Sequence, residues 1–475
     1  MSSISPKHDP TADLQATEEL LYETRQKIYA RSVKGYFANL RWIMVWFTQL
    51  IFYGVPWLRW DGRQAMLLDL STRKFYFFGM ILWPQDVIFL ALLLIIAAYG
   101  LFLFTTIAGR LFCGYACPQT VYTEIFMWIE TKVEGDRLAR MRLDKQALGA
   151  RKFARKATKQ VLWIAVALWT GFSFVGYFTP IRELAGEIIH LQAGPWETFW
   201  VLFYGFATYG NAGYMREQIC KYMCPYCRFE SAMFDRDTLI VTFDPERGEP
   251  RGKRKKGVDA RSLGKGDCVD CSICTQVCPT GIDIRDGLQY MCIGCGACID
   301  ACDQVMDKMG SPRGLIRYSS ENAMQQHWTS KQQWRHMLRP RIVVYGVILV
   351  AMVGVFVGGL AERKPMKLDV SRDRRVLARE IPGGKLENVY QVQLMNASET
   401  PRRVSFTVEG LPGLAVAAQT AEVDIGASTN VLRPLELVLP DERAPRSGVY
   451  KIDIIATAGG AKPVVVEQAS TFIVP

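Results

Sequence analysis

The sequence predicts a multidomain membrane protein in which an α-helical transmembrane bundle of about five spans carries an inserted cysteine-rich domain and a C-terminal β-domain. Three observations support this fold class. The apolar residues, 49% of a 475-residue chain, are concentrated in long runs. Eight cysteines repeat one spacing twice in the middle of the chain, and short alternating runs typical of strands fill residues 362–475.

Five apolar runs are candidates for crossing a bilayer, because a transmembrane helix needs about twenty mostly apolar residues. The runs are 40–58, 87–108, 160–179, 195–214 and 342–361. Glu197, Asn211 and several glycines interrupt the fourth run, for which a buried amphipathic helix is the alternative. We expect residues 40–230 to form a four-span membrane domain and residues 341–361 to form a fifth transmembrane helix.

Loop charges predict the orientation of these spans, since Lys and Arg accumulate on the cytoplasmic side of a membrane. The connection 109–159 carries eleven Lys or Arg residues, whereas the connection 180–194 carries only Arg182. Residues 1–39 are polar and charged, which is typical of a cytoplasmic N-terminal tail and not of a cleaved leader. All thirteen cysteines then fall on the predicted cytoplasmic side, where thiols stay reduced.

A C-x3-C-P motif follows the second and again the fourth apolar run. The two copies are Cys113-Gly-Tyr-Ala-Cys117-Pro118 and Cys220-Lys-Tyr-Met-Cys224-Pro225. A helical segment would place both sulfurs of a pair on one face, and the proline disfavours helical geometry at the second cysteine. The repeat predicts that two membrane hairpins deliver cysteine pairs to the same membrane face.

Three functions are consistent with these cysteines: a soft-metal site, a third iron–sulfur cluster, or a dithiol that cycles with a disulfide. The alternative is that they are inert small residues buried at a helix end. Cys227 follows the second copy but matches no part of the duplicated motif, so the sequence assigns it no role.

Residues 231–340 contain two copies of the cysteine run of bacterial-type ferredoxins. The copies are Cys268-x2-Cys271-x2-Cys274-x3-Cys278-Pro279 and Cys292-x2-Cys295-x2-Cys298-x3-Cys302. In such runs three cysteines bind one [4Fe–4S] cluster and the fourth binds the other. A zinc ribbon would use two C-x2-C pairs instead. We therefore predict a ferredoxin-like domain with two [4Fe–4S] clusters.

The crossing rule also predicts how the ligands are shared. One cluster would be held by Cys268, Cys271, Cys274 and Cys302, and the other by Cys292, Cys295, Cys298 and Cys278. Asp303 stands where a proline follows the first run, which leaves the number of ligands unchanged.

The last part of the chain reads as short strands separated by turn residues. The predicted strands are 389–395, 403–408, 422–425, 431–438 and 449–456. Strands of this length and spacing predict an immunoglobulin-like β-sandwich for residues 362–475.

Composition and motifs exclude several other functions. The net charge of +11 and the basic residues at 251–256 suit a juxtamembrane segment, and no nucleic-acid module accompanies them. We find no dinucleotide-binding or phosphate-binding loop. None of the four histidines, His8, His190, His327 and His336, lies in an apolar run, which argues against a bis-histidine haem. Electrons should then arrive from an unidentified donor, either a partner protein or a quinol.

The two C-x3-C-P motifs after membrane hairpins, the dicluster insert, the fifth span and the outer β-domain together resemble the CcoG/FixG/RdxA family of cytochrome cbb3 oxidase accessory proteins. The resemblance covers the chain after residue 30. It implies a multi-pass iron–sulfur electron-transfer protein of the bacterial cytoplasmic (inner) membrane, with cytoplasmic clusters and a periplasmic C-terminal domain.

The resemblance also implies an activity, a cupric reductase that converts Cu(II) to Cu(I) during oxidase assembly. Its partners would be a copper-exporting P-type ATPase, oxidase assembly factors and membrane lipid. Cys113, Cys117, Cys220 and Cys224 would then be the catalytic residues that contact copper or relay electrons, and copper would be a substrate.

Two other functions are consistent with the same residues. A quinol-oxidising relay similar to NapH shares the four spans, the C-x3-C-P pairs and the two clusters, but it lacks the fifth span and the outer domain. A non-enzymatic assembly scaffold whose clusters sense redox state is the third reading.

Overall fold

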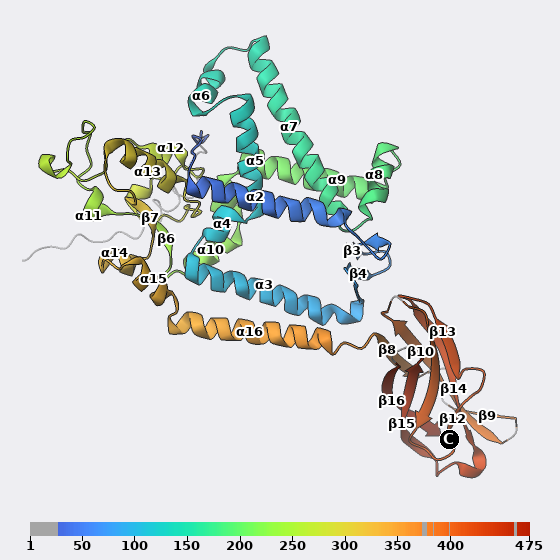
Figure 1. The fold of residues 1–475 in the computed structure, drawn as a ribbon. Helices are drawn as coiled ribbons and strands as arrows, with labels where there is room; N and C mark the ends of the chain where they lie inside the picture. The colour runs from blue at the N-terminus through green and yellow to red at the C-terminus, as the bar shows by residue number, and fades with distance from the viewer. Residues whose placement is uncertain (1–26, 373–377, 383, 399, 460–462) are drawn as a thin grey trace, which may run out of the picture. The chain divides into compact units, whose positions relative to one another are not determined.

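The computed structural model describes residues 27–475 apart from 373–377, 383, 399 and 460–462 (Figure 1). Most of the predicted tail, residues 1–26, and His8 with it, lies outside the described residues. The chain divides into two compact units, each assembled from three segments. The first comprises Met1–Gln49, Phe102–Gly171 and Leu202–Ile342, and the second comprises Leu50–Leu101, Phe172–Val201 and Val343–Pro475.

Three helices of the described chain are long and apolar enough to cross a membrane. They are α3 (Val87–Ala108), α7 (Ala150–Val175) and α16 (Pro340–Ala361). The most apolar stretch of α3 has no buried residue, which suits a helix surrounded by lipid because its backbone groups are satisfied internally.

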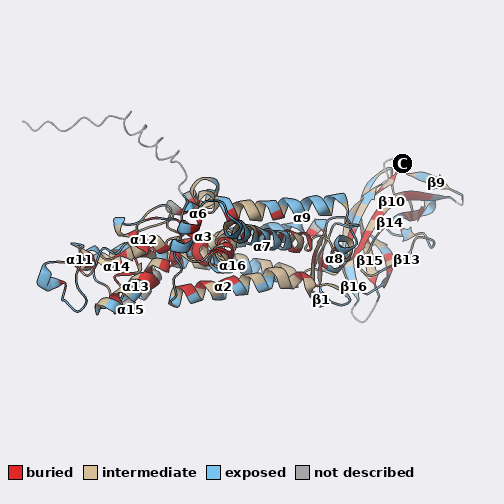
Figure 2. Cartoon of the chain, turned by 90° about the horizontal axis from the view of Figure 1, so that it is seen from above, coloured by how far each residue is buried: buried red, intermediate tan, exposed pale blue. Residues whose placement is uncertain are grey.

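The other two predicted spans are also largely helical. They correspond to α2 (Tyr36–Gly54) and α9 (Pro195–Thr208), and much of the length of both is exposed or half-buried (Figure 2). The 14-residue α9 leads into two π-helical segments, Tyr209–Met215 and Ile219–Met223. The count of five spans stays a prediction, as does their sidedness.

The first unit also contains short helices and a small two-stranded sheet. The helices are α4 (Leu111–Tyr115), α5 (Pro118–Val133), α6 (Arg137–Lys145), α10 (Pro225–Ser231), α11 (Pro245–Gly248), α12 (Ile273–Val277), α13 (Ala297–Met309), α14 (Glu321–Gln325) and α15 (Ser330–Met337). Strand β6 (Ile240–Phe243) pairs antiparallel with β7 (Ile316–Ser319). Val241, Phe243 and Ile316 pack with the buried cysteines Cys268 and Cys274 in one apolar core.

The second unit contains α8 (Ile181–Ile189) and the short strands of the 59–86 connection. These strands are β1 (Arg59–Trp60), β2 (Arg63–Gln64), β3 (Met66–Asp69), β4 (Lys74–Phe77) and β5 (Met80–Leu82). Strands β3, β4 and β5 form one antiparallel sheet, and β1 pairs with β2.

Two antiparallel sheets form the C-terminal part of this unit. Their strands are β8 (Met366–Arg372), β9 (Arg379–Ile381), β10 (Lys385–Asn396), β11 (Arg402–Glu409), β12 (Ala415–Val416), β13 (Glu422–Ile425), β14 (Asn430–Pro440), β15 (Gly448–Ala458) and β16 (Val464–Val474). One sheet has the order β12-β14-β10-β8, with β9 also paired to β10, and the other has the order β13-β11-β15-β16. Tyr390 and Leu437 of the first sheet share a buried core with Phe406 and Ile454 of the second.

The five predicted strands correspond to β10, β11, β13, β14 and β15. The sequence analysis did not identify β8, β9, β12 and β16. The last of these carries Glu467, Gln468 and Ser470 between apolar ends, so its alternation is weak in sequence, yet it pairs along its whole length with β15.

Candidate metal centre

Four cysteines of the inserted domain line one small cavity between α12 and α13. They are Cys268, Cys271, Cys274 and Cys302, the set predicted to share one cluster. Asp270 and Ser272 have positive φ values of 54° and 53°, a backbone geometry that curls the Cys268–Cys274 loop back on itself. A pocket walled by four thiols fits a [4Fe–4S] cluster, which proteins hold through Cys thiolates.

The other four cysteines also lie close together. Burial, followed by the charges of Cys295, Cys292 and Cys278, raises the pKa of Cys298 well above its ordinary value. Buried neighbouring thiols raise each other's pKa, so they do not ionise readily by themselves. A metal group would remove this obstacle, because a thiol that coordinates a metal is deprotonated outright. The structure thus places Cys302 with the first run, and Cys278 is near enough to the second run to influence the pKa of Cys298, while ligation itself stays a prediction.

The two C-x3-C-P motifs have the same local geometry. Cys117 and Cys224 are extended residues directly before helices α5 and α10, and each is followed by the proline that begins the helix. In both motifs, burial raises the pKa of this second cysteine, and the first backbone amides of the helix donate to its sulfur and oppose the increase. The first cysteines lie in α4 and in the π-helical segment Ile219–Met223, so only the first of each pair is helical.

Cys227 lies at the centre of these sulfurs. Hydrogen bonds from the thiols of Cys113 and Cys220, together with the Arg110 guanidinium, lower the pKa of Cys227, and Cys224 also contributes. Only 2% of Cys227 is exposed. The sequence predicts no role for Cys227 because it has no counterpart in the first motif, although its C-x2-C spacing from Cys224 is a signal that points to it.

Arg110 links this group of sulfurs to the inserted domain. Its guanidinium pairs with Glu230 at 3.0 Å and donates to the carbonyl of Cys227 at 2.9 Å. The same side chain donates to the carbonyls of Tyr290 and Cys292. The Glu230 carboxylate lies 3.8 Å from the sulfur of Cys113, and burial raises the pKa of Glu230 to about 7. Neither Arg110 nor Glu230 was singled out by the sequence.

The segment of the first motif packs directly on the second ferredoxin run. A Cβ atom at Gly114 would lie 2.8 Å from the carbonyl oxygen of Ile293 and 2.9 Å from the Cα of Cys295. The Tyr115 hydroxyl donates to the carbonyl of Cys295 at 3.2 Å. Helix α4 and the Cys292–Cys295 loop are therefore in backbone contact. Helix α4 belongs to the C-x3-C-P group of cysteines, and the loop belongs to the second ferredoxin run.

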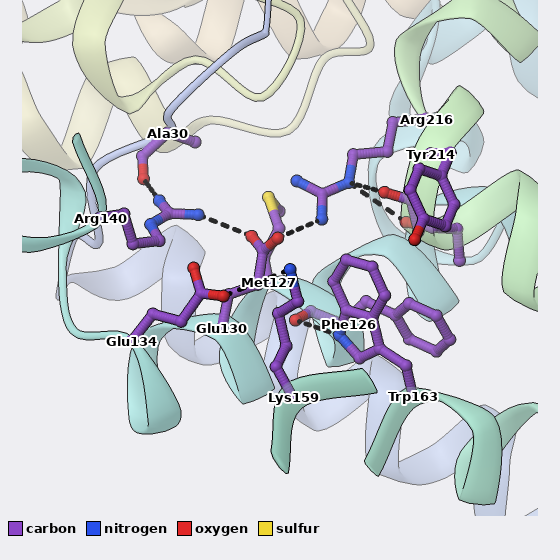
Figure 3. Close-up of polar contacts among 12 residues, drawn as sticks. Ala30, Phe126, Met127, Glu130, Glu134, Arg140, Lys159, Trp163, Tyr214 and Arg216 are labelled. Carbon is purple, nitrogen blue, oxygen red and sulfur yellow. Dashed lines mark hydrogen bonds and ion pairs between the residues drawn. The ribbon is translucent and has the colours of Figure 1, made fainter. Parts of the chain in front are cut away.

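A buried ion-pair network holds the second motif against the first. Glu130 of α5 pairs with Arg140 at 2.6 Å and with Arg216 at 2.8 Å (Figure 3). Arg216 has a positive φ of 37° and stands between the two π-helical segments, four residues before Cys220. Gln119, in the first turn of α5, donates to the carbonyls of Asn211 and Arg216. The helix that begins after Cys117 thus fixes the chain that leads to Cys220.

A small cavity reaches Cys220. Its volume is about 30 Å³, and Glu124, Glu217 and Met127 are among the residues that line it. Across the described residues, no three His, Cys, Asp or Glu side chains are arranged to hold a single metal ion. A role of Cys113, Cys117, Cys220 and Cys224 in contacting copper stays a prediction.

Comparisons with known families match three parts of the chain. A 4Fe-4S dicluster domain matches residues 215–321, and a 4Fe-4S binding domain matches residues 90–134. A domain described as an IG-like fold at the C-terminal of FixG matches residues 356–475. The two iron–sulfur matches contain all thirteen cysteines.

Curated relatives match most of the chain. Protein RdxA of Cereibacter sphaeroides is 40% identical over 90% of this chain and 93% of its own. Nitrogen fixation protein FixG of Rhizobium meliloti is 39% identical over 88% of this chain and 87% of its own. A crystal structure of a FixG-related protein from Vibrio parahaemolyticus matches 23% of this chain and 97% of its own, at 20% identity and a TM-score of 0.21.

Proposed function

This chain belongs to the family of FixG and RdxA, and we propose that it is a membrane-bound iron–sulfur electron-transfer protein that reduces Cu(II) to Cu(I) during cytochrome cbb3 oxidase assembly. Membership of this family, the iron–sulfur domain matches and the apolar helices support the electron-transfer part. The reduction of Cu(II) is the part of the proposal that goes beyond these observations.

The observation that carries the proposal is the backbone contact between the two groups of cysteines. When bound, [4Fe–4S] clusters supply single electrons, which is the number that Cu(II) needs to become Cu(I). Gly114 and Tyr115, beside Cys113 and Cys117, touch the loop that contains Cys295. A copper ion at the C-x3-C-P sulfurs would thus be next to the group held by the second ferredoxin run.

The chemistry of the sulfurs and their surroundings also supports a copper substrate. Soft thiolates select Cu(I), while carboxylate oxygens suit the harder Cu(II). The cavity beside Cys220 is lined by two carboxylates, Glu124, which pairs with Arg41 at 3.9 Å, and Glu217. Its volume of about 30 Å³ exceeds the roughly 10–15 Å³ that one water needs, so an ion could enter it.

The proposal extends to location and partners. We place the protein in the bacterial inner membrane with its cysteines on the cytoplasmic side, where Cu(I) would be passed to a copper-exporting P-type ATPase. The C-terminal domain would form an immunoglobulin-like β-sandwich in the periplasm and dock oxidase assembly factors there. The excess of Lys and Arg in the connection 109–159 supports this orientation.

Cu(II) reduction by the purified protein tests the proposal. We expect Cys117→Ser and Cys224→Ser to lose the activity while the iron content and the EPR signals of both ferredoxin clusters are kept. Ala116→Ser, which adds a hydroxyl one residue away, is the control and should keep its activity. Full activity in both cysteine variants would refute the copper site.

The same assay separates the alternatives. A protein whose clusters are reduced by quinol but which does not reduce Cu(II) would be a relay similar to NapH. Absence of both reactions would favour a redox-sensing scaffold.

A further inference from the structure

A cavity of about 220 Å³ lies beside the second ferredoxin run, separate from the C-x3-C-P sulfurs. Its walls come from the end of α3, from residues 234–241 and from residues 288–294, all within the first unit. Cys292, a predicted cluster ligand, forms part of the wall. The proposed reduction of Cu(II) does not involve this cavity.

The lining predicts a small, uncharged, ring-shaped ligand. Phe234, Leu239 and Leu288 contribute apolar surface, and Tyr290 contributes an aromatic ring. Drug-sized ligands occupy pockets of about 300–1,000 Å³, so this cavity suits a single substituted ring. Arg110 is the one charged residue in its wall, and Glu230 and three backbone carbonyls already engage it. A ligand bearing phosphate would therefore find no free cation there.

The position of the cavity predicts a ligand that dissolves in the membrane. Ala108, the last residue of α3, lines the cavity, and α3 is a 22-residue helix apolar enough to span a bilayer. The Leu239 amide donates to the carbonyl of Ile107 at 3.1 Å, and the Thr238 hydroxyl donates to the carbonyl of Thr106 at 3.1 Å. This wall is therefore tied to the end of the membrane helix, where the apolar tail of a bound lipid-soluble molecule could lie along α3.

Tyr290 provides the polar contact that such a ring needs. The Arg110 guanidinium stacks 5.1 Å from the centre of the Tyr290 ring and also binds its carbonyl, so this residue is held in place. About 39% of Tyr290 is exposed. Tyr290 lines the cavity and carries a hydroxyl group, which is the kind of donor that an oxygen on a bound ring needs.

We infer that this cavity binds the ring of a membrane quinol, which is the electron donor of the protein. The inference rests on the proposed electron-transfer function and names its electron source. Oxidation of the bound quinol to the quinone releases two electrons and two protons. Clusters held by the ferredoxin cysteines, with Cys292 in the wall of the cavity, would accept these electrons one at a time, and water would accept the two protons.

Photolabelling of the detergent-solubilised full-length protein tests the site without relying on activity. The probe is a photoreactive azido derivative of a short-chain ubiquinone, and labelled peptides are identified by mass spectrometry. We expect labelling within residues 234–241 or 288–294 that unlabelled short-chain quinone competes away. Labelling confined to other parts of the chain, or labelling without competition, would overturn the inference.

Variants sharpen the test. Leu288→Trp fills the cavity from an exposed loop position and should lower labelling and quinol-driven cluster reduction by about tenfold, which corresponds to ~1.4 kcal/mol of binding. Leu263→Trp is the matched control, because Leu263 is 50% exposed, against 55% for Leu288, and does not line the cavity. Tyr290→Phe, which keeps the ring, should weaken labelling by several-fold. Equal behaviour of Leu288→Trp and Leu263→Trp would overturn the inference.

A last measurement separates this inference from the proposed function. Protein that is reduced with dithionite and then freed of the excess reagent by gel filtration bypasses the quinol, so Leu288→Trp should then reduce Cu(II) at the wild-type rate. Failure of the dithionite-reduced wild type to reduce Cu(II) would refute the copper function and leave the quinone labelling unaffected. Absence of competable quinone labelling in the wild type, with intact copper reduction by the pre-reduced protein, would refute the quinol site alone.

Discussion

At the scale of single residues, Arg110 organises the space between the two cysteine groups. One guanidinium binds a carboxylate on one side and the carbonyls of Tyr290, Cys292 and Cys227 around it. Its planar fork carries five N–H donors and can serve all four acceptors, whereas a lysine ammonium has only three. Glu230 is fully buried and compensates the charge of Arg110, so neither partner can be removed without leaving a buried charge unpaired.

Cys227→Ser should affect the site at least as strongly as either cysteine of the second motif. Its sulfur is the one that interacts with Cys113, Cys220 and Cys224 alike. We expect Cu(II) reduction to fall by about tenfold or more, in line with the losses seen when groups around a metal site are removed. Iron content and the EPR signals of the ferredoxin clusters should be unchanged, and wild-type copper reduction in this variant would show that Cys227 is only a packing residue.

Asp144 should make stability depend on pH in the acid range. Burial raises the pKa of Asp144, but hydrogen bonds from Lys156, Lys27 and Tyr29 outweigh it and leave the pKa below the ordinary value. The stabilisation is therefore present above the unfolded-state pKa of about 4 and is lost as the pH falls further. The pairs are partly exposed, so we expect a loss of about 1 kcal/mol.

Thermal unfolding of the wild type and Asp144→Asn at pH 7 and at pH 3 measures this contribution. The variant should have the lower midpoint at pH 7, and the difference between the two proteins should become smaller at pH 3, because only the unfolded-state carboxyl has titrated by then. The same difference between the two proteins at both pH values would contradict the assignment.

At the scale of elements, the duplicated motif works through helix starts. Each C-x3-C-P ends one helical segment and begins another, so its second sulfur receives amide hydrogen bonds from a helix N-terminus. The Glu130–Arg216 ion pair connects helix α5, which follows the first motif, to the π-helical segments that lead to the second motif. Irregular helix geometry of this kind is frequent at functional sites.

Gly114→Ala should separate α4 from the loop of the second ferredoxin run. The added methyl would stand under 3.0 Å from the backbone at Ile293 and Cys295, so one of the two segments must move. Overpacking of this kind costs about 1–3 kcal/mol. We expect a lower midpoint of thermal unfolding and a changed EPR signal from one ferredoxin cluster only. Gly210→Ala, where the methyl meets no atom within 4 Å, is the control.

At the scale of the whole molecule, one buried carboxylate joins distant segments of the second unit. Asp86, 1% exposed at its side chain, precedes α3 and pairs with Arg363 at 2.6 Å and with Lys367 at 2.5 Å. Lys74 of β4 also donates to the carbonyl of Ser428 at 2.7 Å. These contacts hold the 59–86 connection on the C-terminal sheets.

Asp86→Asn should loosen the attachment of the C-terminal sheets. The Lys367 side chain is 37% exposed and keeps part of its hydration, so we expect a cost below the ~3–5 kcal/mol of breaking a fully buried pair. We expect limited proteolysis between α16 and β8 to become faster. Asp369→Asn, at an exposed position of β8, is the control, and equal cleavage rates in the two variants would show that Asp86 is not the attachment point.

The sequence predicts features that a local spacing pattern defines, and it does not predict features that depend on packing between distant segments. The ferredoxin runs and the duplicated C-x3-C-P motif were visible because their spacing is regular. The bridge made by Arg110 and the close approach at Gly114 join segments more than a hundred residues apart, so no spacing pattern in the sequence predicts them. Strands β8 and β16 were missed because their pairing partners, and not their own alternation, define them.

The packing of Gly114 and Tyr115 on the second ferredoxin run limits how the molecule can be dissected. A soluble fragment cut at residues 231 and 340 would contain every ferredoxin cysteine, yet it would leave behind the α4 surface that covers Ile293 and Cys295. Those residues are only 6% and 8% exposed in the intact chain, so the fragment would present a bare apolar loop to solvent. Such a fragment is a poor surrogate for the redox centre, and a faithful one must retain residues 110–118 as well.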